Sequence, residues 1–421
     1  MSDKRKSSIL DALSFRGFRY FLLGAFVSSI GTWLQVAALM WLVEQYKVSN
    51  DTLVAVINMA SWMPVLLFGL FSGAISDRLD RRRTILISQF IMMGCSLAIA
   101  VTATCKFVNI GMIIALITIS GTAYAFFVIA WVALQPVLVD KESILDAVAL
   151  NNGQFNLARF VGPLLAGALL VWWVPSAFYL NAVTFLAFIA LIYAAGVKTE
   201  PPRAGGGASR SHPLTEVAEG LRYVAGTGWM LKVLIAMSLI SFFGFSFIVL
   251  MPAVSRQLLH IQAVRYGLLF GMTGLGAVVG MPSLAFLHRH VHYDNILRIS
   301  ATLATGMLVC FSLSGIYWVS CLLAFLLGAD FLVFIGAVNG MLVKHARQDM
   351  VGRVSSMWVV GFIGIYPLGG LLLGIITDIW KVEIALLVGA AGCGLVTVWL
   401  LLSPIMKKAE EAISESEQGA A

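Results

Sequence analysis

The stretch Gly73-Ala-Ile-Ser-Asp77-Arg78-Leu-Asp80-Arg81-Arg82-Arg83 decides the fold of this 421-residue chain. An apolar run of membrane-spanning length, 52–75, precedes this basic loop, and another, 84–105, follows it. Its arginines cannot enter hydrocarbon, so they hold the loop on the cytoplasmic side. Positive charge does not explain Gly73 or Asp77. A glycine near a helix end permits close approach of a second helix, and a carboxylate among arginines needs a cation or a positive helix end as its partner.

The composition indicates an integral membrane protein. Hydrophobic residues make up 60% of the chain and charged residues 12%, about half the charged share of a soluble domain. The net charge of +7 arises from basic residues in short loops, which favours membrane orientation over nucleic-acid binding. The five cysteines are scattered through apolar runs, so we expect buried thiols and no metal or cofactor.

Twelve apolar runs have the length that a bilayer requires. They predict an all-α protein with helices at about 21–43, 52–75, 84–105, 108–133, 146–171, 175–196, 229–252, 266–287, 295–315, 317–341, 353–377 and 382–404. An even number of spans places both termini on one side. The excess of Lys and Arg in the terminal segments and alternate loops predicts the cytoplasmic side of a bacterial inner membrane.

A single long polar interruption, 198–228, divides the chain into halves 1–197 and 229–421. The first part of this linker is rich in glycine, and its second part has apolar residues at helical spacing, which predicts a helix on the membrane surface. Each half carries a proline and glycines at a similar position, which is typical of transporters built from repeats. We expect these residues to permit close or bent helix packing: Gly162, Pro163, Gly167, Pro367, Gly369 and Gly370.

The whole chain resembles the major facilitator superfamily. The basic loop is similar to the latch that this superfamily carries after its second helix, although Asp80 stands where a second glycine is usual. Three other stretches resemble the subfamily of enterobactin exporters and macrolide efflux proteins: Leu150-Asn-Asn-Gly-Gln-Phe-Asn-Leu-Ala-Arg159-Phe-Val-Gly162-Pro163, His212-Pro213-Leu214 with Gly220-Leu-Arg222-Tyr223, and Met350-Val-Gly352-Arg353-Val354.

This resemblance implies two pseudo-symmetric six-helix bundles and a transporter that works by alternating access. The chain has no ATP-binding glycine loop, so an ion gradient would drive it. The resemblance also implies gating residues where the latch meets helix 11: Gly73, Asp77, Arg78, Arg81, Arg82, Gly352 and Arg353.

Polar side chains at mid-membrane depth are candidates for substrate binding. Asn152, Asn156 and Arg159 fall on one face of the fifth predicted helix. They could line a cavity and bind an anionic group, or Arg159 could lock onto a neighbouring helix. Gln35 and Asn58 are further candidates, each of which could instead form an interhelical hydrogen bond.

Aromatic side chains within spans could stack on an amphipathic substrate, or could simply pack. The candidates are Trp33, Tyr124, Trp131 and Trp358. A second group lies at the outer helix ends, where aromatic residues serve as interface anchors: Trp172, Trp173, Tyr317, Trp318 and Trp380.

The histidines of His288-Arg-His290-Val-His292 could bind a metal ion. A surface turn without a nearby cysteine or second histidine cluster makes a poor site, so we interpret this stretch as a weakened copy of the basic loop.

Asp330 is the carboxylate that lies deepest in a predicted span, 317–341. Burial favours the neutral form of a carboxyl group, so Asp330 could bind and release a proton in each cycle. Two alternatives remain: a permanent pair with Arg159, or contact with a cationic group of the substrate.

These features favour a proton-coupled exporter of a small amphipathic molecule, such as a siderophore or a drug, acting as a monomer among membrane lipids. Uptake of a metabolite is the alternative within transport. A membrane enzyme or signalling protein on the same fold is less consistent, because the acid, base or metal ligands of an enzyme should gather near one membrane face.

Replacing Asp77 with Asn should abolish transport while the protein still folds and inserts, because the latch would lose its charge. Transport assays together with a check of membrane insertion measure this effect. Normal turnover of the Asp77→Asn variant would contradict a gating role.

Overall fold

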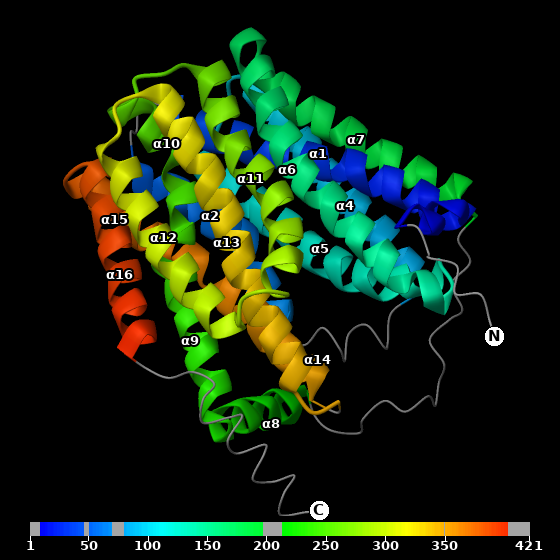
Figure 1. The fold of residues 1–421 in the computed structure, drawn as a ribbon. Helices are drawn as coiled ribbons and strands as arrows, with labels where there is room; N and C mark the ends of the chain where they lie inside the picture. The colour runs from blue at the N-terminus through cyan, green and yellow to red at the C-terminus, as the bar shows by residue number, and fades with distance from the viewer. Residues whose placement is uncertain (1–8, 46–49, 70–79, 197–212, 349, 403–421) are drawn as a thin grey trace, which may run out of the picture. The chain divides into compact units, whose positions relative to one another are not determined.

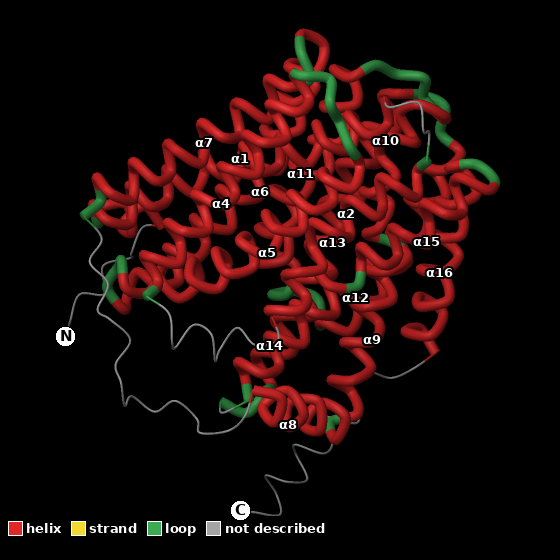
Figure 2. The backbone as a smooth tube through the Cα atoms, turned by 180° about the vertical axis from the view of Figure 1, so that it is seen from behind, coloured by secondary structure: helices red, strands yellow, loops and turns green. Residues whose placement is uncertain are grey.

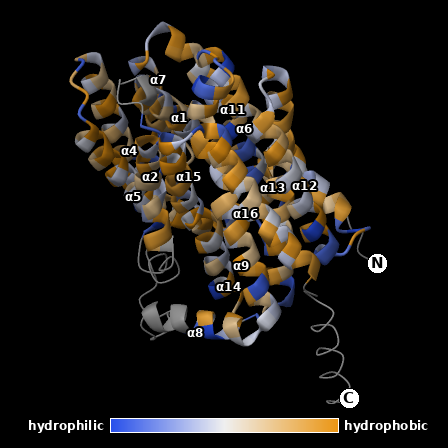
Figure 3. Ribbon diagram, turned by 90° about the vertical axis from the view of Figure 1, so that its left-hand side faces the viewer, coloured by the Kyte–Doolittle hydropathy of each residue, from blue (hydrophilic) through white to orange (hydrophobic). Residues whose placement is uncertain are grey.

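The computed structural model describes residues 9–45, 50–69, 80–196, 213–348 and 350–402 (Figure 1). This part of the chain contains helices and loops but no strand (Figure 2). Twelve of its helical segments are long and apolar enough to cross a membrane, which confirms the predicted all-α fold with twelve spans. The helices are mostly orange in Figure 3, as suits segments surrounded by lipid chains.

Ten spans are each formed by one long α-helix, and those of α5 and α6 also include a short 3-10 helix at one end. The first six are α1 (Arg16–Gln45), α2 (Asp51–Gly69), α4 (Arg81–Thr104), α5 (Ile110–Leu134), α6 (Ile144–Trp172) and α7 (Pro175–Ala194). The later ones are α11 (Ala263–Leu287), α12 (Tyr293–Leu313), α13 (Tyr317–His345) and α16 (Val382–Leu402). The linker forms α8 (Pro213–Gly226), so its predicted helix exists.

The seventh and eleventh spans are broken, whereas the sequence predicted single helices at 229–252 and 353–377. The seventh consists of α9 (Gly228–Phe243), the 3-10 helix η4 (Phe245–Leu250), α10 (Met251–Ala253) and the π-helix η5 (Val254–Leu258). The eleventh consists of α14 (Val351–Val359), the π-helix η6 (Val360–Gly364) and α15 (Tyr366–Ile379). Gly244 and Pro252 lie at the breaks in the seventh span, and Gly364 and Pro367 lie at the break in the eleventh. Both residue types lower the stability of a regular helix, although α2, α6 and α11 each contain a proline without a break.

Polar side chains cap several helices where they begin. The Asp80 carboxylate accepts a hydrogen bond from the backbone N–H of Arg83 at 2.9 Å, so it caps α4. The Asn109 side chain caps α5 in the same way, through the N–H of Met112 at 3.2 Å. Asp80 thus has a structural role in place of the expected glycine.

The contacts divide the chain into two compact units. Unit 1 comprises 1–46, 67–209 and 263–274, and unit 2 comprises 47–66, 210–262 and 275–421. The predicted halves 1–197 and 229–421 are close to these units, but the first part of α2 groups with unit 2 and the first part of α11 with unit 1. The linker at 198–228 remains a predicted boundary.

Unit 1 has an aromatic core where α1, α5 and α7 meet. The ring of Trp131 lies 4.9 Å from that of Phe21 and 4.8 Å from that of Phe127, and it stacks on Phe188 at 6.2 Å. These side chains are almost entirely buried. Burial of aromatic surface of this size is a principal source of packing energy.

Glycines bring the backbones of α1, α6 and α11 close together in unit 1. A Cβ added to Gly162 on α6 would lie 2.6 Å from the Cβ of Trp33 and 2.8 Å from the carbonyl oxygen of Ile30, both on α1. On the α11 side, a Cβ at Gly271 would lie 2.9 Å from the carbonyl oxygen of Phe160. Helix α6 is therefore held between two helices by residues without side chains.

Replacing Gly162 with Ala should lower the melting temperature of the protein in detergent, because the added methyl group meets the backbone of α1. Overpacking of this kind typically costs about 1–3 kcal/mol. Gly153→Ala is the matched control on the same helix, since a Cβ there meets nothing within 4 Å. Tryptophan fluorescence during heating measures both variants, and equal melting temperatures would contradict the tight packing of α6 on α1.

Candidate functional site

Asp330 lies in the middle of α13, next to Ser300 of α12. The Ser300 hydroxyl donates a hydrogen bond of 2.6 Å to Oδ1 of Asp330. The other oxygen, Oδ2, is buried and has no hydrogen-bond partner among the described residues. One oxygen of this carboxyl group is thus engaged, while the other is shielded from water without a donor.

Arg159 is 5% exposed in α6 and lies over an aromatic ring of α1. Its guanidinium carbon is 5.2 Å from the centroid of Trp33, and the ring of Phe155 is 5.9 Å from that of Trp33. A guanidinium placed over an indole face gains cation–π attraction, which is stronger where water is excluded. The structure therefore brings two predicted substrate residues, Arg159 and Trp33, together in unit 1.

The asparagines of α6 differ from each other in their surroundings. Asn152 is exposed, whereas Asn156 is 8% exposed and donates a 3.0 Å hydrogen bond to the carbonyl oxygen of Asn152. The side chain of Asn156 thus bonds to its own helix.

Gln35 takes part in a hydrogen-bond network among three helices of unit 1. Its Oε1 accepts from Ser96 of α4 and from Asn181 of α7, each at 2.7 Å. These contacts favour the interhelical alternative for Gln35. Asn58 of α2 is 4% exposed, and its Oδ1 has no hydrogen-bond partner among the described residues.

Three aromatic candidates mainly pack against other side chains. Trp131 belongs to the aromatic core of unit 1, and Tyr124 packs against that core with its ring 6.0 Å from Phe127. In unit 2, Trp358 donates from Nε1 to the carbonyl oxygen of Ile335 at 3.2 Å. These contacts favour the packing alternative.

The gating candidates are only partly visible, because Gly73, Asp77 and Arg78 lie outside the described residues. Arg81 begins α4, and the Arg82 guanidinium lies 5.1 Å from the ring centroid of Tyr193. At the other predicted partner of the latch, in unit 2, Gly352 and Arg353 lie in the first turn of α14.

Arg353 forms an ion pair with the linker helix. Its Nη1 lies 2.8 Å from Oε2 of Glu219 on α8. An added Cβ at Gly220 would lie 3.1 Å from the Cβ of Arg353, and the Tyr223 hydroxyl accepts from the N–H of Arg347 at 3.2 Å. Helix α8 is therefore fastened to α14, a contact that the sequence did not predict.

The residues predicted for helix packing lie at close helix contacts. An added Cβ at Gly167 of α6 would lie 2.8 Å from the carbonyl oxygen of Ala263 on α11, and Pro163 directs its carbonyl oxygen at Gly267. Pro367 is in the first turn of α15. In unit 2, Gly369 meets the backbone of Phe242, and a Cβ at Gly370 would lie 2.7 Å from Val249.

The histidine loop bonds to its own backbone. Nδ1 of His288 lies 3.2 Å from the carbonyl oxygen of Leu284, and Nδ1 of His290 lies 3.2 Å from that of Phe286. In the described part of the chain, no group of three or more His, Cys, Asp or Glu residues could hold a metal ion.

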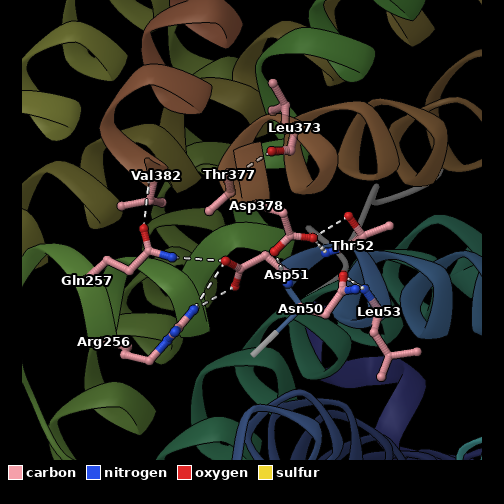
Figure 4. Close-up of polar contacts among 10 residues, drawn as sticks. All are labelled: Asn50, Asp51, Thr52, Leu53, Arg256, Gln257, Leu373, Thr377, Asp378 and Val382. Atoms are coloured by element: carbon pink, nitrogen blue, oxygen red, sulfur yellow. Dashed lines mark hydrogen bonds and ion pairs between the residues drawn. The ribbon is translucent and has the colours of Figure 1, made fainter. Parts of the chain in front are cut away.

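A polar cluster at the start of α2 was not recognised from the sequence. Figure 4 shows the Asp378 carboxylate against the backbone of Asp51 and Thr52, while the Asp51 carboxylate points toward an arginine and a glutamine. We call the four side chains the polar clamp: Asp51, Arg256, Gln257 and Asp378. The one available signal was Asn50-Asp51-Thr52, a typical start of a helix, but the partners come from distant segments.

The chain belongs to the transmembrane secretion effector family, which matches it over residues 7–419. It is thus a transporter of the major facilitator superfamily rather than an enzyme, which confirms the resemblance noted in the sequence. Two solved structures share the fold at 13% identity: a POT family peptide transporter (TM-score 0.72, 92% of this chain and 96% of that one) and a variant of the nucleoside transporter NupG (TM-score 0.69, 94% and 99%).

Curated relatives are similar over most of their length. The staphyloferrin A transporter of Staphylococcus aureus is 24% identical, covering 95% of this chain and 99% of its own. The enterobactin exporter EntS of Citrobacter koseri is 22% identical (91% and 90%), and macrolide efflux protein A of Streptococcus pyogenes is 21% identical (77% and 80%).

Replacing Gln35 with Leu should destabilise unit 1 without weakening substrate binding, because Asn181 would lose this acceptor and Ser96 would keep only the carbonyl oxygen of Phe178. Hydrogen bonds between membrane helices contribute about 0.6 kcal/mol on average, so we expect a loss of about 1 kcal/mol. Thr102→Val is the control, since the Thr102 hydroxyl bonds only to carbonyl oxygens of its own helix among the described residues. A weakened substrate affinity with unchanged thermal stability would instead assign Gln35 to the binding site.

Proposed function

We propose that this transporter exports a small amphipathic molecule, of the siderophore or drug-like class, in exchange for protons. The single observation that carries the coupling step is the carboxyl group of Asp330, whose Oδ1 is bonded to Ser300 and whose Oδ2 is buried without a donor in the described part of the chain. A carboxyl group in hydrocarbon surroundings is costly when charged and unpaired, so proton uptake would relieve that cost.

The names of the relatives support the choice of substrate class. One transports staphyloferrin A, one exports enterobactin and one is a macrolide efflux protein. The first two substrates are siderophores, and the third is a class of drug. Identities of 21% to 24% are too low to transfer any of these substrates to this chain.

Arg159 and Trp33 form the part of the proposed substrate site that has a defined geometry. A guanidinium stacked on an indole offers both a cation and an apolar face, which suits an amphipathic molecule with an anionic group. Asn152, which is exposed, and Asn58, whose Oδ1 has no hydrogen-bond partner in the described part of the chain, remain polar candidates. The other candidates would act through their contacts within the helix bundle: Asn156, Gln35, Tyr124, Trp131 and Trp358.

The proposed orientation places both termini in the cytoplasm and the first residues of α2 on the outer side, in agreement with the distribution of Lys and Arg. Uptake is the alternative direction, and it would use the same orientation with a reversed exchange. Inside-out vesicles distinguish the two, because an exporter accumulates substrate in them when their lumen is acidified.

Replacing Asp330 with Asn should abolish pH-driven accumulation but leave substrate binding and exchange intact, because the amide keeps the shape of the side chain and cannot take up or release a proton during transport. Purified protein in proteoliposomes with an acidic lumen, tested with enterobactin, staphyloferrin A and a macrolide as probes, measures both activities. A pH-sensitive dye in the lumen reports proton release.

The matched control is Asp140→Asn, a neutralised carboxylate at an exposed loop position. It should accumulate the same probe as well as the unchanged protein does. If Asp330→Asn still concentrates a probe against its gradient, proton transport by Asp330 is wrong. If none of the three probes is moved by the unchanged protein, the proposed substrate class is wrong.

A further inference from the structure

The amino-terminal end of α2 is bonded to a carboxylate from another helix. The N–H groups of Asp51 and Thr52 donate to the two oxygens of Asp378 on α15, at 2.7 and 2.9 Å, and the Thr52 hydroxyl donates to the same carboxylate (Figure 4). Asn50 accepts the next N–H, that of Leu53, at 3.1 Å. The first three amides of α2, which have no partner within a helix, are all satisfied, and a carboxylate lies at the positive helix end.

Asp51 itself is buried and bonded to the broken seventh span. Its carboxylate, 4% exposed, lies 3.2 Å from Nη2 of Arg256 and accepts a 2.9 Å hydrogen bond from Nε2 of Gln257. Both partners lie on the π-helix η5. Gln257 in turn accepts from the N–H of Val382, at the start of α16, at 3.1 Å. Through the polar clamp, α2 is joined to η5, α15 and α16, all within unit 2.

The same face of α2 has close backbone contacts along its length. A Cβ added to Gly374 of α15 would lie 2.9 Å from the carbonyl oxygen of Asp51 and 3.1 Å from the Cβ of Ala55. Further along, Gly364 of η6 meets the side chain of Leu66. The clamp is therefore the polar end of a longer, otherwise apolar contact.

A buried ionic cluster is a weak source of stability, because desolvation of the charges offsets much of their attraction. Its better attested use is to specify one arrangement against another. Every clamp residue lies within three positions of the end of its candidate span, so the cluster marks one end of these helices rather than their middle. Two clamp residues, Arg256 and Gln257, lie on the π-helix η5, and π-helical turns are frequent at functional sites.

We propose that the polar clamp holds the first part of α2 against α15 and α16, and that its strength sets how often this end of α2 opens during transport. In the proposed orientation this is the outer end, so the clamp would be the outer counterpart of the basic loop. This inference rests on alternating access and on the proposed orientation. It does not depend on the identity of the substrate or on proton transport by Asp330.

A cysteine at Val54 reports whether this end of α2 is closed, because Val54 is 2% exposed and a cysteine side chain is smaller than that of valine. The test uses the full chain with its five native cysteines replaced. A membrane-impermeant maleimide is added to intact cells, and the rate of labelling at position 54 is measured. Labelling needs no substrate, so its result does not depend on whether the proposed export function is correct.

Asp378→Asn and Asp51→Asn should each label at least about tenfold faster than the parent chain, since each removes a negative charge on which several donors converge and places an NH₂ group where one accepting oxygen was. Thr52→Ala removes only the hydroxyl bond and should label a few-fold faster; this mild variant keeps the test valid if a neutralised carboxylate prevents folding. Arg256→Gln combined with Asp51→Asn should label no faster than Asp51→Asn alone, because the two residues act as a pair.

The matched control is Thr377→Val, next to Asp378 on α15. The Thr377 hydroxyl bonds to Leu373 of its own helix at 2.8 Å (Figure 4), so this variant should label like the parent. If the clamp variants fold and label within about twofold of Thr377→Val, the clamp does not hold α2 and the proposal is overturned. Faster labelling only when the maleimide is added to inside-out vesicles would likewise overturn the proposed outer location.

Discussion

The absence of water in the bilayer core is the constraint on which this structure depends. Every backbone amide and every charge within the spans must find a partner in the protein, because hydrocarbon offers none. Helices satisfy most of the backbone, and Ser and Thr hydroxyls bond back to their own helices, as Thr32 does to Ser28 and Thr118 to Ile114. What remains are helix ends, helix breaks and the few ionisable side chains, and the proposed proton site and the polar clamp lie at such positions.

Close helix packing at glycine residues is a second consequence of the same constraint. Since lipid is as apolar as leucine, helices associate in membranes through close packing rather than through the hydrophobic effect. Gly162, Gly271 and Gly374 each allow one backbone to approach another, and in each case a methyl group would meet the neighbouring helix. Close packing of this kind fixes helix positions, whereas η4, η5 and η6 depart from regular α-helical geometry, which is common at functional sites.

The twelve spans could be predicted from the sequence because a run of apolar residues is a local property. The breaks themselves were not predicted. Bent packing was expected near Pro367 in the eleventh span, but Gly244 and Pro252 in the seventh were not singled out, because glycine and proline occur in many membrane helices. The hydrogen-bond partners of the polar side chains could not be predicted at all. Asp330 was identified as a deep carboxylate, but that its neighbour would be Ser300, 30 positions earlier, depends on how α12 packs on α13.

The polar clamp and Asp330 show that the position of a carboxylate along a span does not reveal how many hydrogen-bond donors surround it. Asp378 and Asp51 lie at helix ends, yet donors from two segments converge on them: the start of α2 donates to Asp378, and η5 donates to Asp51. Asp330 lies deeper, and only one of its oxygens has a donor in the described part of the chain. A carboxylate surrounded by donors is suited to hold helices together, whereas a buried one with a free oxygen has a place for a proton. The difference lies in the number of donors that the fold supplies, and that number is a property of tertiary packing.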